Sequence, residues 1–224
     1  MANNYTLMTQ EKDERIYIVV ADDHTILVDG VVQILQANPK YHVVGTANNG
    51  QEAIDIVKKG RVDIIIMDIN MPVMDGIDAT EIISETFEKT KVLIMSMHNK
   101  AGYIQNAIKA GASGYILKNT TPDELEEAID RVLEGGSYFS QDVSNLMALS
   151  MRGLADKKTE IKLSRQEKLL LRLLSEGSTS EEISDSMETS IHTISSYRRN
   201  LLIKFDAKNV TQLIAMAIKD GFIE

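Results

Sequence analysis

Five short runs rich in β-branched residues constrain the fold of this chain more than any other feature. They lie at residues 16–21, 42–46, 63–67, 91–95 and 114–117. Several are apolar on both faces, which is what parallel strands need when helices cover both sides of their sheet. The stretches between them carry apolar residues at a spacing near 3.6, which predicts helices. Five strands alternating with five helices predict a doubly wound α/β domain over residues 15–138.

The pattern changes after residue 138. Residues 139–160 hold one moderately apolar stretch, from Val143 to Leu154, which predicts a helix within a linker. Residues 163–220 then give four short helical segments separated by polar turns, and a capping box of Ser164 and Glu167 opens the first of them. We therefore expect a small all-α domain over residues 161–224, and a flexible polar tail over residues 1–14.

Composition excludes several classes of protein. The absence of cysteine excludes disulfide frameworks, thiolate zinc sites and cysteine nucleophiles. No apolar run approaches the ~20 residues that span a bilayer, and the N-terminus lacks the pattern of a secretory signal, so a cytoplasmic protein without a membrane partner is expected. The net charge of −9 is unevenly placed: residues 1–155 hold 13 basic and 22 acidic side chains, whereas residues 156–224 hold 11 of each.

Polar side chains follow four of the predicted strands: Asp22 and Asp23 the first, Asp68 the third, Ser96 the fourth and Lys118 the fifth. Ligands of open α/β sheets bind beyond the carboxyl ends of the strands, so these groups should meet. Clustered carboxylates suit Mg²⁺, and an ammonium and a hydroxyl suit a phosphoryl group. Singly, each residue could be a helix cap, a turn residue or a solvated charge. Together they predict a carboxylate that accepts a phosphoryl group.

Residues 15–138 resemble the receiver domain of two-component response regulators. The match includes the order of these strand-end residues, the pairs Met71-Pro72 and Asp75-Gly76, and the sequence Gly-Ala-Ser-Gly-Tyr at 111–115. Asn119 departs from the pattern, because many receivers have Pro after the Lys. The resemblance implies the strand order 2-1-3-4-5 of flavodoxin-like folds, for which the receiver CheY is a standard example.

The resemblance also implies roles. Asp68 would be the phosphoacceptor, and Asp22, Asp23, Asp68 and the backbone carbonyl of Asn70 would hold Mg²⁺. Lys118 would then pair with the phosphoryl group.

Three further residues concern the switch. Ser96 would move to hydrogen-bond the phosphoryl group, and Tyr115 would turn inward as Ser96 leaves its place. Taken alone, Tyr115 would be interpreted as a half-buried strand aromatic. His98 could influence water attack on the acyl phosphate, or could be an exposed loop residue.

The second and third helical segments of the C-terminal part suggest a DNA-binding helix-turn-helix. The third, from about residue 191 to 205, can turn Ile194, Leu201 and Phe205 to a core and leave a polar face outward. Hydroxyls on that face can reach phosphates or base edges, and arginines can bind guanine or phosphate. The same periodicity would fit a solvated face of a helical bundle. The predicted DNA contacts are Thr193, Ser195, Ser196, Tyr197, Arg198, Arg199 and Lys204.

Residues 163–217 resemble the LuxR-type output domain. The match comprises Leu-Ser-x-x-Glu at 163–167, Glu-Ile-Ser at 182–184, the run from Ser190 to Tyr197, and Lys204-Phe205. Ser195 and Tyr197 stand where many members have Lys and His. The whole chain thus resembles a response regulator of the NarL/FixJ family. In that family the last helix pairs two output domains, which implicates Leu213, Ile214 and Ala217, although these residues could instead pack on their own bundle.

We therefore expect a transcription regulator rather than an enzyme. A sensor histidine kinase would phosphorylate Asp68, and a homodimer would then bind double-stranded DNA. Two alternatives remain. A Mg²⁺-dependent phosphohydrolase with an aspartyl-phosphate intermediate usually has an Asp-x-Asp motif, whereas Asp68 is followed by Ile69-Asn70. A phosphorylation-independent adaptor would not need the intact pocket. A nucleotide-binding domain is discounted, because residues 45–50 lack the Gly-x-Gly-x-x-Gly spacing.

Overall fold

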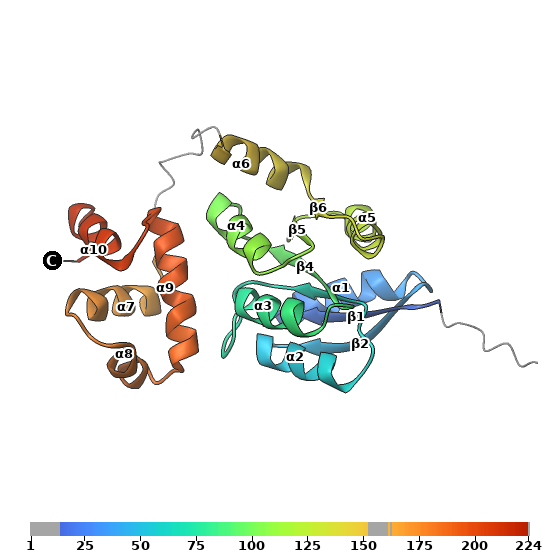
Figure 1. Ribbon diagram of the computed structural model, residues 1–224, viewed down its shortest axis with the longest axis horizontal. Helices are drawn as coiled ribbons and strands as arrows, with labels where there is room; N and C mark the ends of the chain where they lie inside the picture. Colours follow the sequence, from blue (N-terminus) through green and yellow to red (C-terminus); the bar gives the residue numbers. More distant parts are fainter. Residues whose placement is uncertain (1–13, 152–160, 162, 224) are drawn as a thin grey trace, which may run out of the picture.

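The computed structural model describes residues 14–151, 161 and 163–223. The expected tail, apart from Glu14, and residues 152–160 of the expected linker lie outside this range. The α/β domain comes first along the chain and the helical domain second (Figure 1). The elements of the α/β domain are β1 (Ile16–Ala21), α1 (Thr25–Gln36), β2 (Tyr41–Ala47), α2 (Gly50–Lys59), β3 (Ile64–Met67), α3 (Gly76–Thr86), β4 (Lys91–Ser96), α4 (Ala101–Lys109), β5 (Gly114–Leu117), α5 (Pro122–Leu133) and β6 (Tyr138–Phe139).

The strands form one parallel sheet in the order β2-β1-β3-β4-β5-β6. The predicted doubly wound fold is confirmed, as is the strand order taken from the resemblance. The two-residue strand β6 was not predicted, and it extends the sheet beyond β5 through pairs such as Tyr115 with Phe139.

Alternation along the strands builds a core on each face of the sheet. In β1, Val19 faces the layer of α2, α3 and α4, whereas Ile18 and Val20 face the layer of α1 and α5. All three side chains are fully buried. This explains why central strands such as β1 and β3 are apolar on both faces: both faces lie under helices.

Helix α6 (Gln141–Met151) follows β6 and packs on the α4 side of the sheet. Its Val143 is fully buried and joins the same core as Tyr103 and Ile104 of α4. The predicted linker helix is therefore present, and its first turns belong to the core of the α/β domain.

The helical domain contains α7 (Arg165–Ser175), α8 (Ser180–Ser186), α9 (Ile191–Phe205) and α10 (Val210–Lys219). Ser164 and Thr179 each form a capping box at the start of their helix. The core includes Leu170, Ile183 and Leu201, one from each of the first three helices. Helix α9 lies between the other three helices and the α/β domain (Figure 1). Among the residues described, no helix has the length and apolarity needed to cross a membrane.

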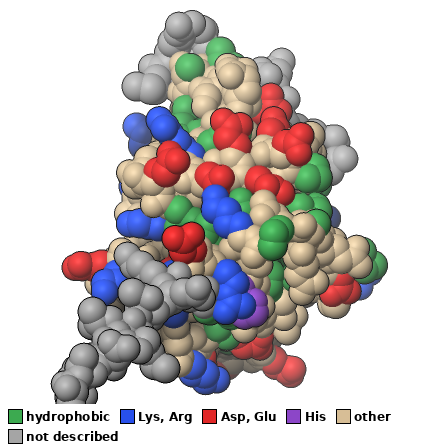
Figure 2. All heavy atoms as spheres, turned by 90° about the vertical axis from the view of Figure 1, so that its right-hand side faces the viewer, with side chains coloured by type: hydrophobic (Ala, Val, Ile, Leu, Met, Phe, Trp, Pro, Cys, Tyr) green, Lys and Arg blue, Asp and Glu red, His purple; other side chains and the backbone are tan. Residues whose placement is uncertain are grey.

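The face of the α/β domain turned away from α7–α10 is rich in charge. Acidic side chains lie there with basic ones between them (Figure 2). Helix α5 contributes the exposed residues Asp123, Glu124 and Glu127. Helix α5 thus carries part of the acidic excess of the chain.

Gly76 sets the distance between the start of α3 and the end of β3. A Cβ atom at this position would lie 1.8 Å from the carbonyl oxygen of Asp68 and 2.8 Å from its carbonyl carbon. Only glycine allows the two backbones to approach so closely. The Asp75-Gly76 pair is therefore a packing requirement of the strand end that carries Asp68.

We predict that Gly76→Ala lowers the free energy of unfolding by about 3 kcal/mol, the upper end for overpacking, because backbone must move to admit the methyl group. Gly30→Ala in α1 is the matched control, since nothing lies within 4 Å of its added Cβ. It should stabilise the chain by ~0.5–1 kcal/mol through helix propensity. Urea unfolding measures both variants, and equal stabilities would contradict the close contact at Gly76.

Candidate phosphoryl-acceptor pocket and DNA-binding helix

The strand register brings the predicted pocket residues to one edge of the sheet. Ala21 of β1 pairs with Met67 of β3, so that the residues following them stand side by side. Ser96 of β4 pairs with Leu117 of β5, and the amide of Lys118 donates to the carbonyl of Ser96 at 3.0 Å. A parallel sheet aligns the carboxyl ends of its strands, and this places the four polar groups together.

Lys118 lies between two buried carboxylates. Its Nζ is 2.6 Å from Oδ2 of Asp22 and 3.2 Å from Oδ2 of Asp68. The exposed fraction is 4% for each of the Lys118 and Asp68 side chains and 1% for that of Asp22. Charges so far from water are stable only when they are paired, so the ammonium is required to hold these carboxylates together.

His24 also belongs to the pocket, and sequence reasoning missed it. Its Nδ1 lies 3.0 Å from Oδ1 of Asp22 and 2.8 Å from Oδ1 of Asp23. The hydrogen bond with Asp22 and the charge of Asp23 raise the pKa of His24. Its position directly after the Asp pair was the available signal. A histidine so close to two carboxylates is expected to interact with them whatever the fold.

Ligand atoms from Asp22, Asp23, His24 and Asp68 all lie within 4.8 Å of one another. Three of the four are carboxylate oxygens, the ligands that hard divalent cations prefer. Asp23 has 34% of its side chain exposed, which leaves one side of the cluster open to solvent. The pocket can therefore bind a metal ion.

Burial raises the pKa of Asp68 to about 6. The positive charge of Lys118 acts in the opposite direction, and the negative charge of Asp22 adds to the rise. Ionisation of a carboxylate with these neighbours costs free energy unless a further cation is present. Once it is ionised, the Asp68 carboxylate has an oxygen that can act as a nucleophile.

Ser96 and Tyr115 are both held by the backbone of His98. Ser96 is 1% exposed, and its Oγ accepts from the amide of His98 at 3.3 Å. The Tyr115 hydroxyl donates to the carbonyl of His98 at 2.7 Å. Tyr115 is fully buried while Ser96 accepts from the amide of His98. The half-buried aromatic that the strand pattern suggested is not what the structure contains.

The His98 ring is partly buried, not an exposed loop side chain. It stacks on Tyr103 with ring centroids 3.9 Å apart, and its Nε2 lies in hydrogen-bond contact with the side-chain amide of Asn70. Burial lowers the pKa of His98 to about 4, and the nearby charge of Lys204 contributes. The ring is therefore neutral at pH 7, and Nε2 can accept from Asn70.

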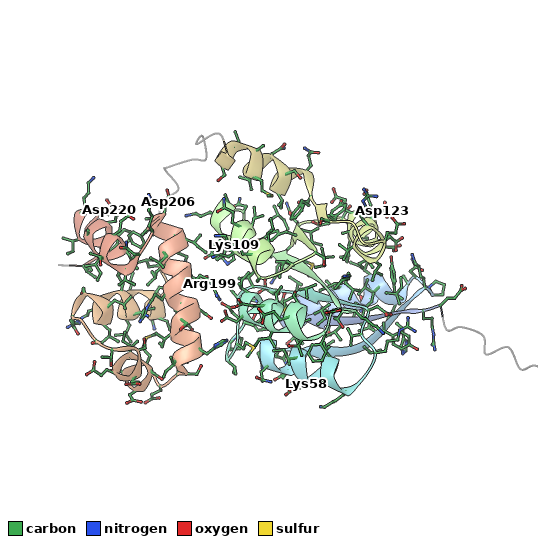
Figure 3. The ribbon with its side chains drawn as sticks, in the orientation of Figure 1. Lys58, Lys109, Asp123, Arg199, Asp206 and Asp220 are labelled. Carbon is green, nitrogen blue, oxygen red and sulfur yellow. The ribbon has the colours of Figure 1, made fainter. Side chains whose placement is uncertain are left out.

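Of the seven predicted DNA contacts, three are bonded to the α/β domain. Thr193 donates to the carbonyl of Val73 at 3.3 Å, and Ser196 donates to Asp78 at 3.1 Å. Arg199 reaches from α9 to the start of α3, where it pairs with Asp78 at 2.7 Å and with Asp75 (Figure 3). We call Asp75 and Asp78 the acidic clasp.

The other four candidates lie differently. Arg198 donates to Ser180 of α8 at 3.2 Å, and Lys204 pairs with Glu167 of α7 at 2.8 Å. Ser195 is exposed, and Tyr197 is partly exposed. The polar face of α9 is thus divided between the clasp, its own domain and solvent.

Helix α10 differs from its predicted role in dimer contact. Leu213 and Ala217 are fully buried in the core of their own domain, so they present no surface to a second copy. The physical reason is that the core of this small bundle takes up the two most inward apolar residues of its last helix. Ile214 is partly exposed and Ile218 is 49% exposed, which leaves these two side chains on the outer face.

Comparison with known proteins now identifies the architecture. Residues 18–130 match the response regulator receiver domain, and residues 162–217 match the luxR family of bacterial regulatory proteins. The transcriptional regulatory protein DegU of Brevibacillus brevis is 32% identical over 231 residues, spanning 96% of this chain and 98% of DegU. The chain belongs to this family of transcriptional response regulators.

Other response regulators align over nearly the same length. UvrY of Escherichia coli strain K12 is 30% identical over 209 residues, spanning 92% of this chain and 95% of UvrY. A structure of Salmonella typhimurium RcsB has a TM-score of 0.60 and 26% identity, spanning 92% of this chain and 99% of RcsB. A structure of two RcsB dimers bound to two parallel DNAs has a TM-score of 0.58, also at 26% identity, spanning 91% and 98%. The α/β domain is hereafter the receiver, and the helical domain the output domain.

The raised pKa of Asp68 predicts a pH-dependent stability. The folded chain binds this proton more tightly than a chain with the ordinary value of 3.8, so ionisation of Asp68 costs stability as pH rises from about 3.8 to about 6. Asp68→Asn removes that cost. Relative to wild type, the variant should gain roughly 2 kcal/mol between about pH 4.5 and 7, at 1.36 kcal/mol per pKa unit.

Urea unfolding in the presence of a metal chelator measures this difference across the pH range. Asp55→Asn, on the exposed side of α2, is the control, because it retains Asp68 and should keep the wild-type profile. A constant difference between Asp68→Asn and wild type at every pH would contradict the raised pKa.

Proposed function

We propose that this chain is a cytoplasmic DNA-binding transcription regulator whose activity is switched by phosphorylation of Asp68. The observation that carries the proposal is the pairing of the buried Asp68 carboxylate with Lys118 at 3.2 Å, in a pocket that also contains Asp22 and Ser96. A buried carboxylate beside an ammonium and a hydroxyl provides a nucleophile and donors for the oxygens of a transferred phosphoryl group. Membership of the receiver family supports a sensor histidine kinase as the donor.

In the proposed reaction, a carboxylate oxygen of Asp68 forms a bond to phosphorus while the bond from phosphorus to the kinase histidine breaks. Lys118 Nζ, already 3.2 Å from Asp68, would follow the charge to the new phosphoryl oxygens. Ser96 would donate its hydroxyl to another of these oxygens. Both groups therefore act by stabilising charge and by orientation, which are the main contributions of protein to phosphoryl transfer.

We propose Mg²⁺ as the metal of this pocket, held by Asp22, Asp23, Asp68 and the backbone carbonyl of Asn70. Its chemistry would be to neutralise the carboxylates and the phosphoryl oxygens that crowd the site. The oxygen-rich ligand set and the open side at Asp23 support this choice.

The described arrangement corresponds, we propose, to the form that does not bind DNA. Thr193, Ser196 and Arg199 donate to the receiver, and a side chain bonded there cannot contact a phosphate or a base edge. His192 adds a contact, with Nε2 3.0 Å from Oδ2 of Asp78. Phosphorylation would release α9 from the acidic clasp. Two output domains could then bind adjacent half-sites, paired through the outer face of α10.

Asp68→Asn should abolish phosphoryl incorporation from acetyl phosphate and Mg²⁺. Among the described carboxylates, only those of Asp22 and Asp68 pair with Lys118, and the resemblance assigns Asp22 to the metal. Phosphate-affinity gel electrophoresis measures the incorporation. Asp55→Asn on α2 is the control and should be labelled as wild type is. Persistent labelling of Asp68→Asn would refute the assignment, and turnover of phosphorylated metabolites would favour a phosphohydrolase instead.

Asp78→Asn should raise the DNA affinity of the unphosphorylated chain about five-fold or more, the lower end of typical coupling between sites. The reason is that Asp78 holds His192, Ser196 and Arg199 at once. Fluorescence anisotropy with a duplex selected from a random-sequence library measures the affinity.

Glu81→Gln is the matched control for this variant. Glu81 lies one turn further along α3 and is exposed, so its replacement removes one negative charge without touching α9. An equal gain in DNA affinity for both variants would mean that only long-range repulsion had changed, and it would contradict the clasp.

A further inference from the structure

Helix α9 contacts the receiver at a second place, beside the phosphorylation pocket. Residues 97–102, which comprise the connection from β4 to α4 and the first two residues of α4, lie between the switch residues on one side and α9 on the other. We call them the β4–α4 segment. Its inner contacts are those of His98 with Ser96 and Tyr115. The outer contacts come from Ile203 and Lys204 of α9, and Asn200 of the same helix reaches the segment through Asn70.

Two contacts join α9 to this segment directly, and a third reaches it through Asn70. Lys100 Nζ donates to the carbonyl of Lys204 at 3.4 Å. Ile203 lies against Gly102 so closely that a Cβ there would be 2.9 Å from its Cγ2 atom. Asn200 donates to the side-chain oxygen of Asn70 at 3.4 Å, and the amide of Asn70 in turn contacts the ring of His98.

A cleft between the two domains continues this contact toward the metal site. Its volume is about 320 Å³. Asp23 and Asn70 line it on the receiver side, and Asn200 and Lys204 line it on the α9 side. The DNA-binding helix therefore forms one wall of the approach to the phosphorylation pocket.

We propose that α9 restrains the phosphorylation site itself, so that the docked output domain slows the phosphorylation of Asp68. This inference rests on the proposed function. For Ser96 to reach a phosphoryl group on Asp68, its Oγ must leave the amide of His98, and the segment that carries His98 must readjust. That segment is fixed from outside by α9. Release of α9, by DNA or by any other means, therefore speeds the reaction at Asp68.

The coupling follows from linkage between two states. If phosphorylation favours the undocked state, then undocking favours phosphorylation by the same free energy at equilibrium. In this chain, the β4–α4 segment and Asn70 take part both in the docking of α9 and in the rearrangement of Ser96 on phosphorylation. Asn200 is a positioning residue here, because it acts on the pocket through Asn70 and does not touch Asp68.

A reversible cross-link tests the proposal directly. In Gly102→Cys/Ile203→Cys, the Cβ at position 102 would lie 3.6 Å from the Cβ of residue 203, within the roughly 3.5–4.5 Å that a disulfide spans. The natural chain has no cysteine, so no other disulfide competes. Mild oxidation of the full chain should lock α9 onto the receiver, and a reducing agent should release it.

With acetyl phosphate and Mg²⁺, the oxidised form should be phosphorylated at least about five-fold more slowly than the same protein after reduction. The cross-link adds to the barrier a free energy that we take at the lower end of typical coupling between sites. Gel mobility without reductant reports whether the cross-link is intramolecular. The single variant Gly102→Cys, treated identically, controls for the oxidant. Equal rates for the locked and reduced forms would overturn the proposal, and so would failure of the intramolecular cross-link to form.

Gly102→Ala provides the opposite perturbation, since its methyl group pushes Ile203 away and alters neither Asp68 nor a predicted DNA contact. It should speed phosphorylation, whereas Gly30→Ala, an open helical position, should match wild type. An unchanged rate in Gly102→Ala would count against the restraint. Absence of phosphoryl incorporation in wild type and in every variant would instead refute the proposed function, so the two failures are distinguishable.

Discussion

The ammonium of Lys118 between two buried carboxylates is the interaction on which the rest of this structure depends. Asp22 and Asp68 stand at the ends of neighbouring strands because the parallel register puts them there, and each would carry a desolvation cost of several kcal/mol if it were left unpaired. A single ammonium cannot neutralise Asp22, Asp23 and Asp68 together. The pocket therefore retains excess negative charge, which a divalent cation and the displacement of Lys118 toward a phosphoryl group would relieve.

The end of β3, which carries Asp68, packs directly against the start of α3, which carries the acidic clasp. Gly76 lies against the carbonyl of Asp68. Asp75, the N-cap of α3, directly precedes Gly76, and Asp78 follows it by two residues in the first turn of the helix. Asp75 caps this helix by accepting from the amides of Ile77 and Asp78, and it also pairs with Arg199. The phosphoacceptor and the anchor of the DNA-binding helix are thus parts of one closely packed unit. A displacement of Asp68 caused by a change in its charge would therefore move the clasp through one backbone contact, that of Gly76 with the Asp68 carbonyl.

Sequence reasoning predicted the sheet and the pocket because both follow from local rules. Apolar strands with covered faces predict a parallel sheet, and a parallel sheet brings the residues after Ala21, Met67 and Leu117 to one edge. The strand β6 was missed because two residues carry no periodicity. Leu213 and Ala217 were assigned to a dimer contact from the family resemblance, and the apolar stripe alone could not show that their own domain covers them.

The sequence could not predict that α9 docks on the receiver, because a surface pattern does not reveal what covers it. Thr193 and Ser196 lie on a polar face that looks the same whether it meets water, DNA or a second domain. The contact of Ser196 with Asp78 joins residues 118 positions apart, and no local pattern links them. Asp75 was noted only as half of a family motif, and its pairing with Arg199 depends on the relative placement of two domains. His24, in contrast, could have been predicted from its neighbours in the chain.

Part of the acidity of the receiver is used to hold groups of α9 that could bind DNA. Asp78 offers carboxylate oxygens to an imidazole, a hydroxyl and a guanidinium, groups that could otherwise bind DNA phosphates. Because clasp and helix belong to one chain, their effective concentration is on the order of millimolar, far above that of any operator. DNA binding must therefore displace an intramolecular competitor. Phosphorylation need not add any attraction for DNA, since weakening the competitor by a few kcal/mol would raise the apparent affinity by the corresponding factor.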